Sequence, residues 1–319
     1  MKKYNILILD CYNIFLRWAW NERNNPKQIK YNNKEINIEG VIAYVKAITH
    51  YIEKYTDKEN SKIYFLFDNA QTTWERKQIY SQYKGCRKDL TESEYRQLDF
   101  CELISSFFVD NSYLFRVPKY EADDFVPNIL RLYKKENDKV LLVSEDMDWS
   151  KWLSDDVEQY VKGGIMNKQL FEEKYGFEPN EKNVCFYKSF YGDKSDNIKG
   201  ALNNFPKQFF DHVIKTYNNI LTFTEDAPKQ EWLDWGWKNK IEKEKNNLIA
   251  NWNLVQSANI EDSELCTLRK LCTFRPNKLE IIYNTLGMVG VDNRIKKKEK
   301  SVEEDFFSIL EGEQLERKQ

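Results

Sequence analysis

The chain has 319 residues, of which 41% are hydrophobic and 15% aromatic, so it can bury a substantial core and is not a disordered chain. Its 49 basic and 51 acidic residues leave a formal net charge of −2, which excludes a uniformly basic nucleic-acid coat but permits local patches of either sign. No apolar run approaches membrane-spanning length, and the first residues lead directly into a strand-like segment, so we expect neither a membrane segment nor a secretory signal.

Cysteine and histidine usage limits the chemistry further. The six cysteines are scattered without a Cys-x-x-Cys pair, and there are only two histidines. This pattern indicates reduced thiols in a cytoplasmic protein and argues against a zinc cage. Any metal ion bound here is expected to be a hard cation held by oxygen ligands.

Short apolar runs alternate with helical segments along the first half of the chain. Strands are expected at residues 4–9, 63–67, 113–117 and 139–144, with a weaker candidate at 157–161. A helix is expected over 38–55, where apolar residues recur at helical spacing. A basic segment with interleaved tyrosines, 74–88, precedes a polar helical piece at 91–108. This alternation predicts an α/β fold with a mainly parallel sheet.

Acidic side chains stand just beyond four of the predicted strands. They are Asp10, Asp68, the cluster Glu121, Asp123 and Asp124, and the pair Asp146 and Asp148. Because parallel strands end at one edge of a sheet, these carboxylates are expected to converge there. Asp193 and Asp196, in the turn-rich stretch 190–200, would join them. Each aspartate alone is usually a cap or a solvated loop residue, but the convergence of all of them argues against that reading.

Repulsion between so many carboxylates must be offset by protonation, by water or by a cation. Magnesium prefers carboxylate ligands and keeps several waters. Two such ions roughly 3.5–4 Å apart can generate a nucleophile and neutralise the entering and leaving oxygens of a phosphodiester. The acidic set therefore points to a phosphodiester hydrolase that uses two Mg²⁺ ions, with Mn²⁺ as a substitute.

Six motifs now carry a family resemblance. In order they are 8–10 (Ile-Leu-Asp), 65–68 (Phe-Leu-Phe-Asp), 83–87 (Tyr-Lys-Gly-Cys-Arg), 121–124 (Glu-Ala-Asp-Asp), 146–148 (Asp-Met-Asp) and 192–198 (Gly-Asp-Lys-Ser-Asp-Asn-Ile). Together they resemble the 5′-nuclease superfamily, which includes flap endonucleases, the 5′–3′ exonuclease domain of bacterial DNA polymerase I, and the small bacteriophage 5′-exonucleases and ribonucleases H. The motifs span nearly two thirds of the chain, and the fourth and sixth form a specific pairing.

The resemblance implies a domain plan and a function. It implies a PIN-like nuclease domain over 1–164 with a helical arch at about 72–109, a helical duplex-binding domain of the helix-hairpin or helix-turn-helix type over 165–290, and a charged tail over 291–319. The implied activity is a structure-specific 5′–3′ exonuclease and flap endonuclease that leaves a 5′-phosphate. Its substrates would be branched or 5′-ended duplex DNA and RNA primers in RNA–DNA hybrids. Such small enzymes suggest a monomeric bacteriophage replication protein in the host cytoplasm.

The resemblance also assigns residue roles. Asp10, Asp68, Glu121, Asp123 and Asp124 would hold the first metal ion, and Asp146, Asp148, Asp193 and Asp196 the second. Lys84 and Arg87 match the basic pair that contacts the scissile phosphate from the base of the arch, where positive charge stabilises the developing negative charge; the alternative for both is a solvated helix face. Tyr83 would stack on the terminal unpaired base, and Arg76 would contact the strand, since basic and aromatic residues together bind single strands without sequence preference.

The sequence departs from the family pattern after residue 198. The hairpin keeps Gly200 but its second glycine is replaced, which argues against the family's potassium site, and Lys199 and Lys207 are expected to contact the duplex directly. Arg17 fits a family loop near the duplex junction, with a buried structural arginine as the alternative. Glu145 stands where a small residue is usual and adds a carboxylate beside the second metal group.

The tail leaves two readings open. Residues 301–310 carry Phe306, Phe307, Ile309 and Leu310, either in a helix that binds a sliding clamp or single-strand-binding protein or in an amphipathic helix folded on its own domain.

Three rival functions fit the sequence less well. A toxin-type metal-dependent ribonuclease would lack the long basic insertion and the 192–198 motif. A catalytically inert structure-specific DNA-binding protein on the same fold would not need the complete acidic set. A phosphatase with an aspartyl nucleophile would need a second aspartate two positions after Asp10, where Tyr12 stands.

Overall fold

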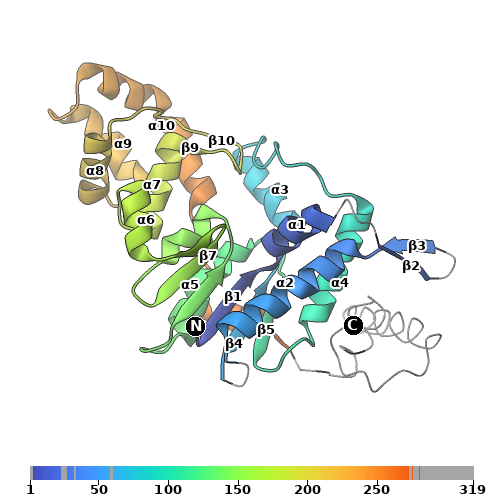
Figure 1. Ribbon diagram of the computed structural model, residues 1–319. Helices are drawn as coiled ribbons and strands as arrows, with labels where there is room; N and C mark the ends of the chain where they lie inside the picture. The colour runs from blue at the N-terminus through green and yellow to red at the C-terminus, as the bar shows by residue number, and fades with distance from the viewer. Residues whose placement is uncertain are drawn as a thin grey trace.

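The computed structural model describes residues 3–22, 27–31, 34–57 and 60–272, together with residues 275 and 280. Its strands are β1 (Ile6–Asp10), β2 (Gln28–Tyr31), β3 (Lys34–Asn37), β4 (Lys62–Leu66), β5 (Ser112–Phe115), β6 (Val140–Val143), β7 (Val157–Val161), β8 (Gly164–Met166), β9 (Gly192–Asp193), β10 (Ile198–Lys199) and β11 (Lys270–Cys272). Seven of them form one sheet in the order β11-β5-β4-β1-β6-β7-β8, which lies at the centre of the N-terminal lobe (Figure 1).

Helices surround this sheet and build a second lobe. They are α1 (Cys11–Glu22), α2 (Glu39–Tyr55), α3 (Ala70–Ile79), α4 (Glu92–Ser105), α5 (Val126–Tyr133), α6 (Lys168–Tyr175), α7 (Glu181–Tyr191), α8 (Lys207–Thr216), α9 (Ile220–Asp226), α10 (Trp235–Val255) and α11 (Asp262–Leu268), with 3₁₀ helices η1 (Ala122–Phe125), η2 (Met147–Trp152) and η3 (Ala227–Lys229). None of the helices in the described ranges combines the length and the apolar character that crossing a bilayer requires.

The central strands are buried on both faces because their side chains alternate between two cores. In β1, Ile6 and Ile8 join one hydrophobic cluster, whereas Leu7 and Leu9 join the other. Strands β5, β4, β1, β6 and β7 run parallel to one another. The five strands predicted from the sequence and the mainly parallel sheet are therefore confirmed.

The two faces of the sheet are covered by different helices (Figure 1). Helices α1, α2 and α4 pack on one face, around Val45, Ile48 and Leu98. Helix α5 and the 3₁₀ helix η1 cover the other face through Phe125 and Ile129. The predicted helix over 38–55 is confirmed as α2. Helix α4 begins at a capping box in which the Thr91 side chain and the Glu94 side chain each accept from the other's backbone N–H.

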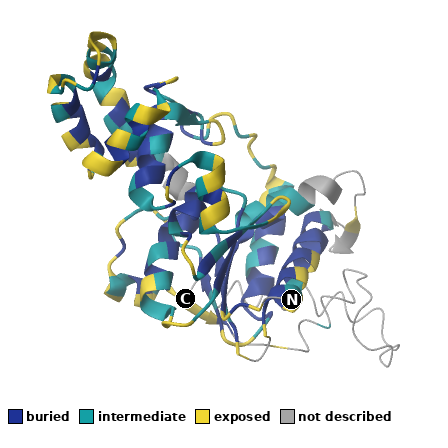
Figure 2. Ribbon diagram, turned by 60° about the vertical axis from the view of Figure 1, so that its left-hand side comes forward, coloured by how far each residue is buried: buried dark blue, intermediate teal, exposed yellow. Residues whose placement is uncertain are grey.

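The second lobe, α6 to α10, has a separate aromatic core. Phe186, Phe190, Phe205 and Phe210 are buried there, and the ring centroids of Phe190 and Phe205 lie 5.2 Å apart in an edge-on arrangement. Figure 2 shows the buried residues as one band through the sheet and another through these helices. This lobe follows β8 along the chain, so the predicted mostly helical character beyond residue 164 is confirmed.

The structure differs from the predicted domain plan at the end of the second lobe. After α10 the chain returns to the sheet: Leu265 of α11 is buried against α5, and β11 pairs antiparallel with β5. The predicted helical domain over 165–290 therefore ends near residue 255. The end of α4, with Ile104 and the following Phe107, packs into the main core, which confines a predicted arch at 72–109 to its first part. Residues 291–319, including the predicted tail helix at 301–310, lie outside the described residues.

The six cysteines all lie within the described residues, and all are free thiols, as predicted. The loop after β10 places an asparagine at a left-handed backbone position. Asn204 adopts a left-handed conformation (φ 66°) just after Gly200, and asparagine tolerates that region better than most residues. Gly200 itself is required by space, because a Cβ there would lie 2.4 Å from the carbonyl carbon of Tyr191.

Candidate metal and nucleic-acid site

A cavity of about 850 Å³ opens at the carboxyl ends of β1, β4 and β6. Eight of the nine predicted metal-binding carboxylates line it: Asp10, Asp68, Glu121, Asp123, Asp146, Asp148, Asp193 and Asp196. The parallel strands explain the convergence, because their carboxyl ends meet at one edge. Cations also lie in its walls, among them Lys84, Arg87, Lys88 and Lys188. The predicted meeting of distant carboxylates therefore exists in the fold.

Asp10 and Asp68 are held at the ends of neighbouring strands. Asp10 accepts hydrogen bonds from Ser144 Oγ at 2.7 Å and from the backbone N–H of Asn13 at 3.0 Å. Asp68 accepts one from the backbone N–H of Ala122 at 2.8 Å. Burial, and then repulsion by Asp68, raises the pKa of Asp10 to about 7, and burial also raises the pKa of Asp68. Burial and repulsion therefore disfavour the charged form of both carboxylates.

Glu121 is balanced by two basic residues. It accepts from Arg76 at 2.7 Å and from Lys84 Nζ at 2.6 Å, and its side chain is almost fully buried. Burial opposes the charged form, but the attraction of Arg76 and Lys84 prevails and lowers the pKa of Glu121 to about 2. Its neighbour Asp123, by contrast, has its pKa raised by burial and by the charge of Asp124.

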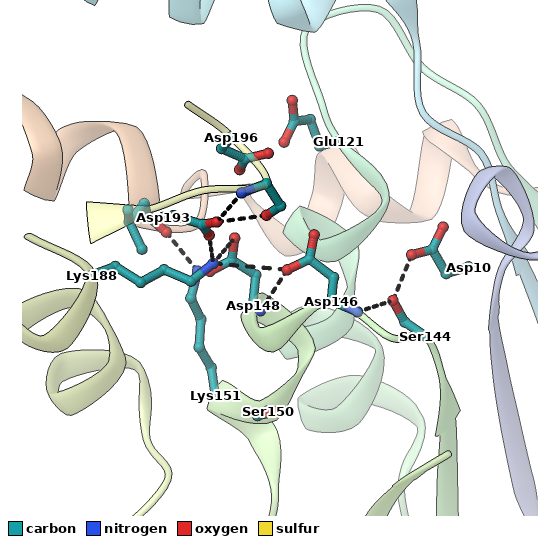
Figure 3. Close-up of polar contacts among 12 residues, drawn as sticks. Asp10, Glu121, Ser144, Asp146, Asp148, Ser150, Lys151, Lys188, Asp193 and Asp196 are labelled. Carbon is teal, nitrogen blue, oxygen red and sulfur yellow. Dashed lines mark hydrogen bonds and ion pairs between the residues drawn. The ribbon is translucent and has the colours of Figure 1, made fainter. Parts of the chain in front are cut away.

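A second acidic group surrounds the ammonium of Lys188 (Figure 3). Lys188 Nζ lies 2.8 Å from Asp148 Oδ2, 2.5 Å from Asp193 Oδ2 and 3.8 Å from Asp146 Oδ1. Burial disfavours the charged carboxylates, yet neighbouring lysines lower the pKa of Asp148 and of Asp193. This group therefore contains an internal counter-ion. Asp146 also caps η2 by accepting from the backbone N–H of Asp148 at 2.9 Å.

The turn after β9 is tied to the base of the predicted arch. Arg87 pairs with Asp196 at 2.5 Å, and the backbone N–H of Lys84 donates to the Asp196 carbonyl at 2.8 Å. Burial raises the pKa of Asp196 to about 6 even though Lys84 opposes the shift. Lys84 adopts a left-handed backbone (φ 53°), which costs a non-glycine residue roughly 1 kcal/mol or more and often marks a functional position. Lys84 and Arg87 thus reach the cavity from the segment where the sequence predicts phosphate contacts.

Three predicted roles need correction because the side chains lie elsewhere. Tyr83 is fully buried in the core of the second lobe, so in this structure it cannot stack on a base. Arg76 forms ion pairs with Glu121 and Asp124, so it does not face a strand-binding surface. Asp124 turns away from the cavity, since it accepts from the backbone N–H groups of Glu121 and Ala258, each at 2.8 Å. It stabilises the loop that carries Glu121 and is not positioned as a metal ligand.

The other predicted nucleic-acid contacts lie outside the cavity. Arg17 pairs with Glu145 at 3.0 Å, which accounts for the unusual acid at that position and favours the structural reading of Arg17. Lys199 and Lys207 are exposed on the second lobe, beside β9 and at the start of α8. Their predicted contact with duplex DNA stays a prediction.

Sequence reasoning missed Lys188 and Ser144. Lys188 stands in α7 among Val184, Cys185 and Phe190, all fully buried, and its side chain is only 2% exposed. A lysine flanked by apolar and aromatic residues within a helix is the signal that could have identified it, because a buried ammonium needs anionic partners. The Ser144 hydroxyl carried no comparable signal.

The donor set fits a divalent cation. Asp148, Asp193 and Asp196 offer carboxylate oxygens that all lie within 4.8 Å of one another. Within the described part of the chain, Asp148 Oδ1 is buried and receives no well-directed hydrogen bond, although a lysine lies near it. Hard oxygen ligands of this kind suit Mg²⁺, Mn²⁺ or Ca²⁺. A cation would also relieve the repulsion that raises the pKa of Asp10.

Comparison with known proteins gives relatives across this region. A family model described as "5'-3' exonuclease, N-terminal resolvase-like domain" matches residues 5–176. A 5′-3′ exonuclease of Buchnera aphidicola (subspecies Schizaphis graminum) is 25% identical over 283 residues, which cover 85% of this chain and 93% of the relative. Another, from the subspecies Acyrthosiphon pisum, is 25% identical over 193 residues, 56% of this chain and 63% of the relative, so the match spans less than two thirds of that protein.

A solved structure shares the fold. The flap endonuclease of bacteriophage T5, in a complex with DNA and metal ions, superposes with a TM-score of 0.59 and 20% identity over 96% of this chain and 98% of that chain. The family match covers more than half of the chain and includes β1, β4, β6 and the carboxylates that follow them. The chain belongs to the 5′-3′ exonuclease family, whose members are phosphodiester hydrolases.

Proposed function

We propose that this chain is a divalent-metal-dependent, structure-specific 5′-nuclease that cleaves branched or 5′-ended duplex DNA. One observation carries the proposal: eight carboxylates from distant parts of the sequence line a single cavity whose walls also hold Lys84 and Arg87. An acidic cavity alone repels a phosphodiester. Cations bound among the carboxylates would reverse that repulsion, and the basic wall would then face the nucleic-acid backbone.

The carboxylates divide into two ligand sets. We propose that Asp10, Asp68 and Asp123, supported by Glu121, hold one ion, and that Asp148, Asp193 and Asp196 hold another. Asp146 lies between Asp10 and Asp148 (Figure 3). We propose Mg²⁺ as the physiological ion, with Mn²⁺ able to replace it. When bound, such ions supply Lewis acidity and neutralise charge on the entering and leaving oxygens.

The basic residues of the cavity bind and orient the substrate. Lys84 and Arg87 are paired with Glu121 and Asp196, so their charges lie beside the carboxylates and not in open solvent. Metal binding to those carboxylates would leave both cations available for the scissile phosphate. Held at fixed positions, they would stabilise charge that develops on its oxygens.

The second lobe is proposed to hold the duplex, through the exposed Lys199 and Lys207. Support comes from the T5 flap endonuclease, which shares the fold and was solved with DNA. We extend the proposal to RNA primers in RNA–DNA hybrids and to a replication role for a monomeric enzyme in the cytoplasm of a bacteriophage-infected host. A clamp or single-strand-binding partner would use residues 301–310, which lie outside the described residues.

A cleavage assay separates this proposal from the inert DNA-binding alternative. The wild-type chain is incubated with a 5′-flap duplex, a blunt duplex and an RNA–DNA hybrid, each with Mg²⁺ or with EDTA. We expect flap cleavage only with Mg²⁺. Asp146→Asn should lower the rate by ~10³-fold or more, because it removes a carboxylate that would hold the ions of the proposed site.

Asp155→Asn is the matched control, since Asp155 is exposed and lies outside the cavity. It should cleave like the wild type. Wild-type protein that binds the flap duplex without cutting it would instead support the inert scaffold. Equal cleavage in EDTA would contradict the role given to the carboxylates.

A further inference from the structure

Lys151 is a buried cation that the proposed mechanism does not use. It lies in η2, its side chain is 0% exposed, and it is not among the residues that line the cavity. Its Nζ is 3.1 Å from Asp148 Oδ1 and donates a hydrogen bond to the Val255 carbonyl at 2.5 Å. An ammonium is stable in such a place only if anionic or dipolar groups surround it. Asp148 is anionic and the Val255 carbonyl is dipolar, so both partners of Lys151 meet that condition.

The spacing of Lys151 follows from the local helix. A 3₁₀ helix has 3.0 residues per turn, so side chains three positions apart lie on the same face. Lys151 is three residues after Asp148 and therefore meets it directly. Val255 is the last residue of α10, where the unsatisfied carbonyls carry partial negative charge that favours a lysine.

The two oxygens of Asp148 consequently have different partners (Figure 3). Oδ1 faces Lys151, whereas Oδ2 faces Lys188 at 2.8 Å. Lys188 lines the cavity, so a cation that enters can take its place. Lys151 lies behind Asp148 and is anchored to α10, so its charge stays when the cavity fills.

We infer that Lys151 is a positioning residue that holds Asp148 with a single oxygen toward the cavity. Because its positive charge is permanent, Lys151 also limits the affinity of this acidic group for a divalent cation. The inference rests on the proposed function, because it concerns the ions of the same site. One-oxygen coordination suits Mg²⁺, whereas Ca²⁺ also accepts carboxylates through both oxygens. Lys151 would therefore also favour the smaller ion.

The helix that anchors Lys151 also contacts the loop after β10. At the other end of α10, Lys240 Nζ donates to the Asn203 carbonyl at 3.3 Å, and the ring of Trp237 packs on Phe205 at 5.0 Å. The same helix thus touches the loop after β10 at one end and Lys151 at the other.

Calorimetric titration of the full chain with Mn²⁺ and with Ca²⁺, without DNA, tests the inference. In Lys151→Gln the amide can still donate to Val255, but the charge is gone. The dissociation constant for Mn²⁺ should fall by about three- to tenfold, since one nearby positive charge no longer opposes the ion. Ca²⁺ should gain at least as much. Lys151→Arg keeps the charge and should match the wild type. Lys139→Gln should also match it, because Lys139, just before β6, is 42% exposed.

A double-mutant cycle assigns the effect to the pair. In an Asp148→Asn background, Lys151→Gln should raise the Mn²⁺ affinity by less than it does in the wild-type background, because the part of the effect that acts through the position of Asp148 is gone and only the direct charge effect remains. If Lys151→Gln does not fold, Lys151→Met provides a second neutral variant with the same expected gain. Unchanged or weaker Mn²⁺ binding by a folded neutral variant overturns the inference and leaves the nuclease proposal standing. A wild-type chain that binds no divalent ion overturns both.

Discussion

The two acidic groups of the cavity use the same residue types but differ in what balances them. Asp10, Asp68 and Asp123 have raised pKa values because burial and mutual repulsion act on them, with burial the larger cause for each. Asp148 and Asp193 have lowered pKa values because lysines outweigh the same burial. One group therefore needs an external cation, whereas the other already holds one.

The division follows the basic residues and not the strands. Glu121 belongs with the first group in space, yet Arg76 and Lys84 keep its pKa at about 2. Asp196 belongs with the second group, yet burial raises its pKa to about 6. Position at the sheet edge brings the carboxylates together, and the neighbouring cations decide their charge state.

Removing the internal counter-ion should produce the largest effect. Lys188→Met leaves the buried carboxylates of Asp148 and Asp193 without their shared partner. Breaking a buried ion pair from one side costs about 3–5 kcal/mol. We expect the free energy of unfolding, measured by urea titration in EDTA, to fall by that amount. Mg²⁺ should restore much of it, since the ion replaces the lost charge.

Lys215→Met in α8 is the control, because Lys215 is exposed. It should change the unfolding free energy by less than about 0.5 kcal/mol. A loss in Lys188→Met that is equally large with and without Mg²⁺ would show that the lysine acts through packing and not through charge.

Neutralising a carboxylate of the first group should instead raise the free energy of unfolding of the metal-free protein. The folded pKa of Asp10 is about 7, against an ordinary value of 3.8, so the folded chain holds this proton more tightly than the unfolded chain. The contribution of Asp10 to stability is therefore fully present below about pH 4 and is lost as the pH rises through 7. Asp10→Asn should stabilise the metal-free protein at pH 8 by up to about 4 kcal/mol and have little effect at pH 4.

Urea titrations of both proteins at the two pH values, in EDTA, measure this difference. Asp155→Asn, at an exposed position, should show no such dependence on pH. The comparison between the groups fails if Asp10→Asn destabilises the metal-free protein at pH 8.

The smallest effect is expected outside both groups, at the Arg17–Glu145 pair. The two side chains are 26% and 29% exposed, and ion pairs of this kind contribute about 0–1 kcal/mol. Arg17→Ala should lower the unfolding free energy within that range and leave the affinity for a flap duplex, measured in Ca²⁺, within twofold of wild type. If Arg17 contacted the duplex, Arg17→Ala would instead weaken binding and reduce the salt dependence of the affinity by the equivalent of about one phosphate contact.

The local sequence pattern was sufficient to predict the sheet and the convergence of carboxylates at one of its edges. Apolar runs such as 4–9 and 139–144 are typical of strands buried on both faces, and parallel strands bring Asp10, Asp68 and Asp146 to one edge of the sheet. Pairings at the sheet's margins were not predictable in this way. Strand β11 is three residues long and joins β5 from far along the chain.

Tertiary structure alone decided which charges meet. Arg76 and Tyr83 lie in a basic, aromatic segment that suits a nucleic-acid surface, but their side chains turn inward to Glu121. Lys151 and Lys188 reach Asp148 from two different helices. The direction of a side chain on a loop or helix depends on packing between segments distant in sequence. The amino-acid sequence by itself therefore determined where the carboxylates gather, and only the folded chain determined which of them remain unbalanced.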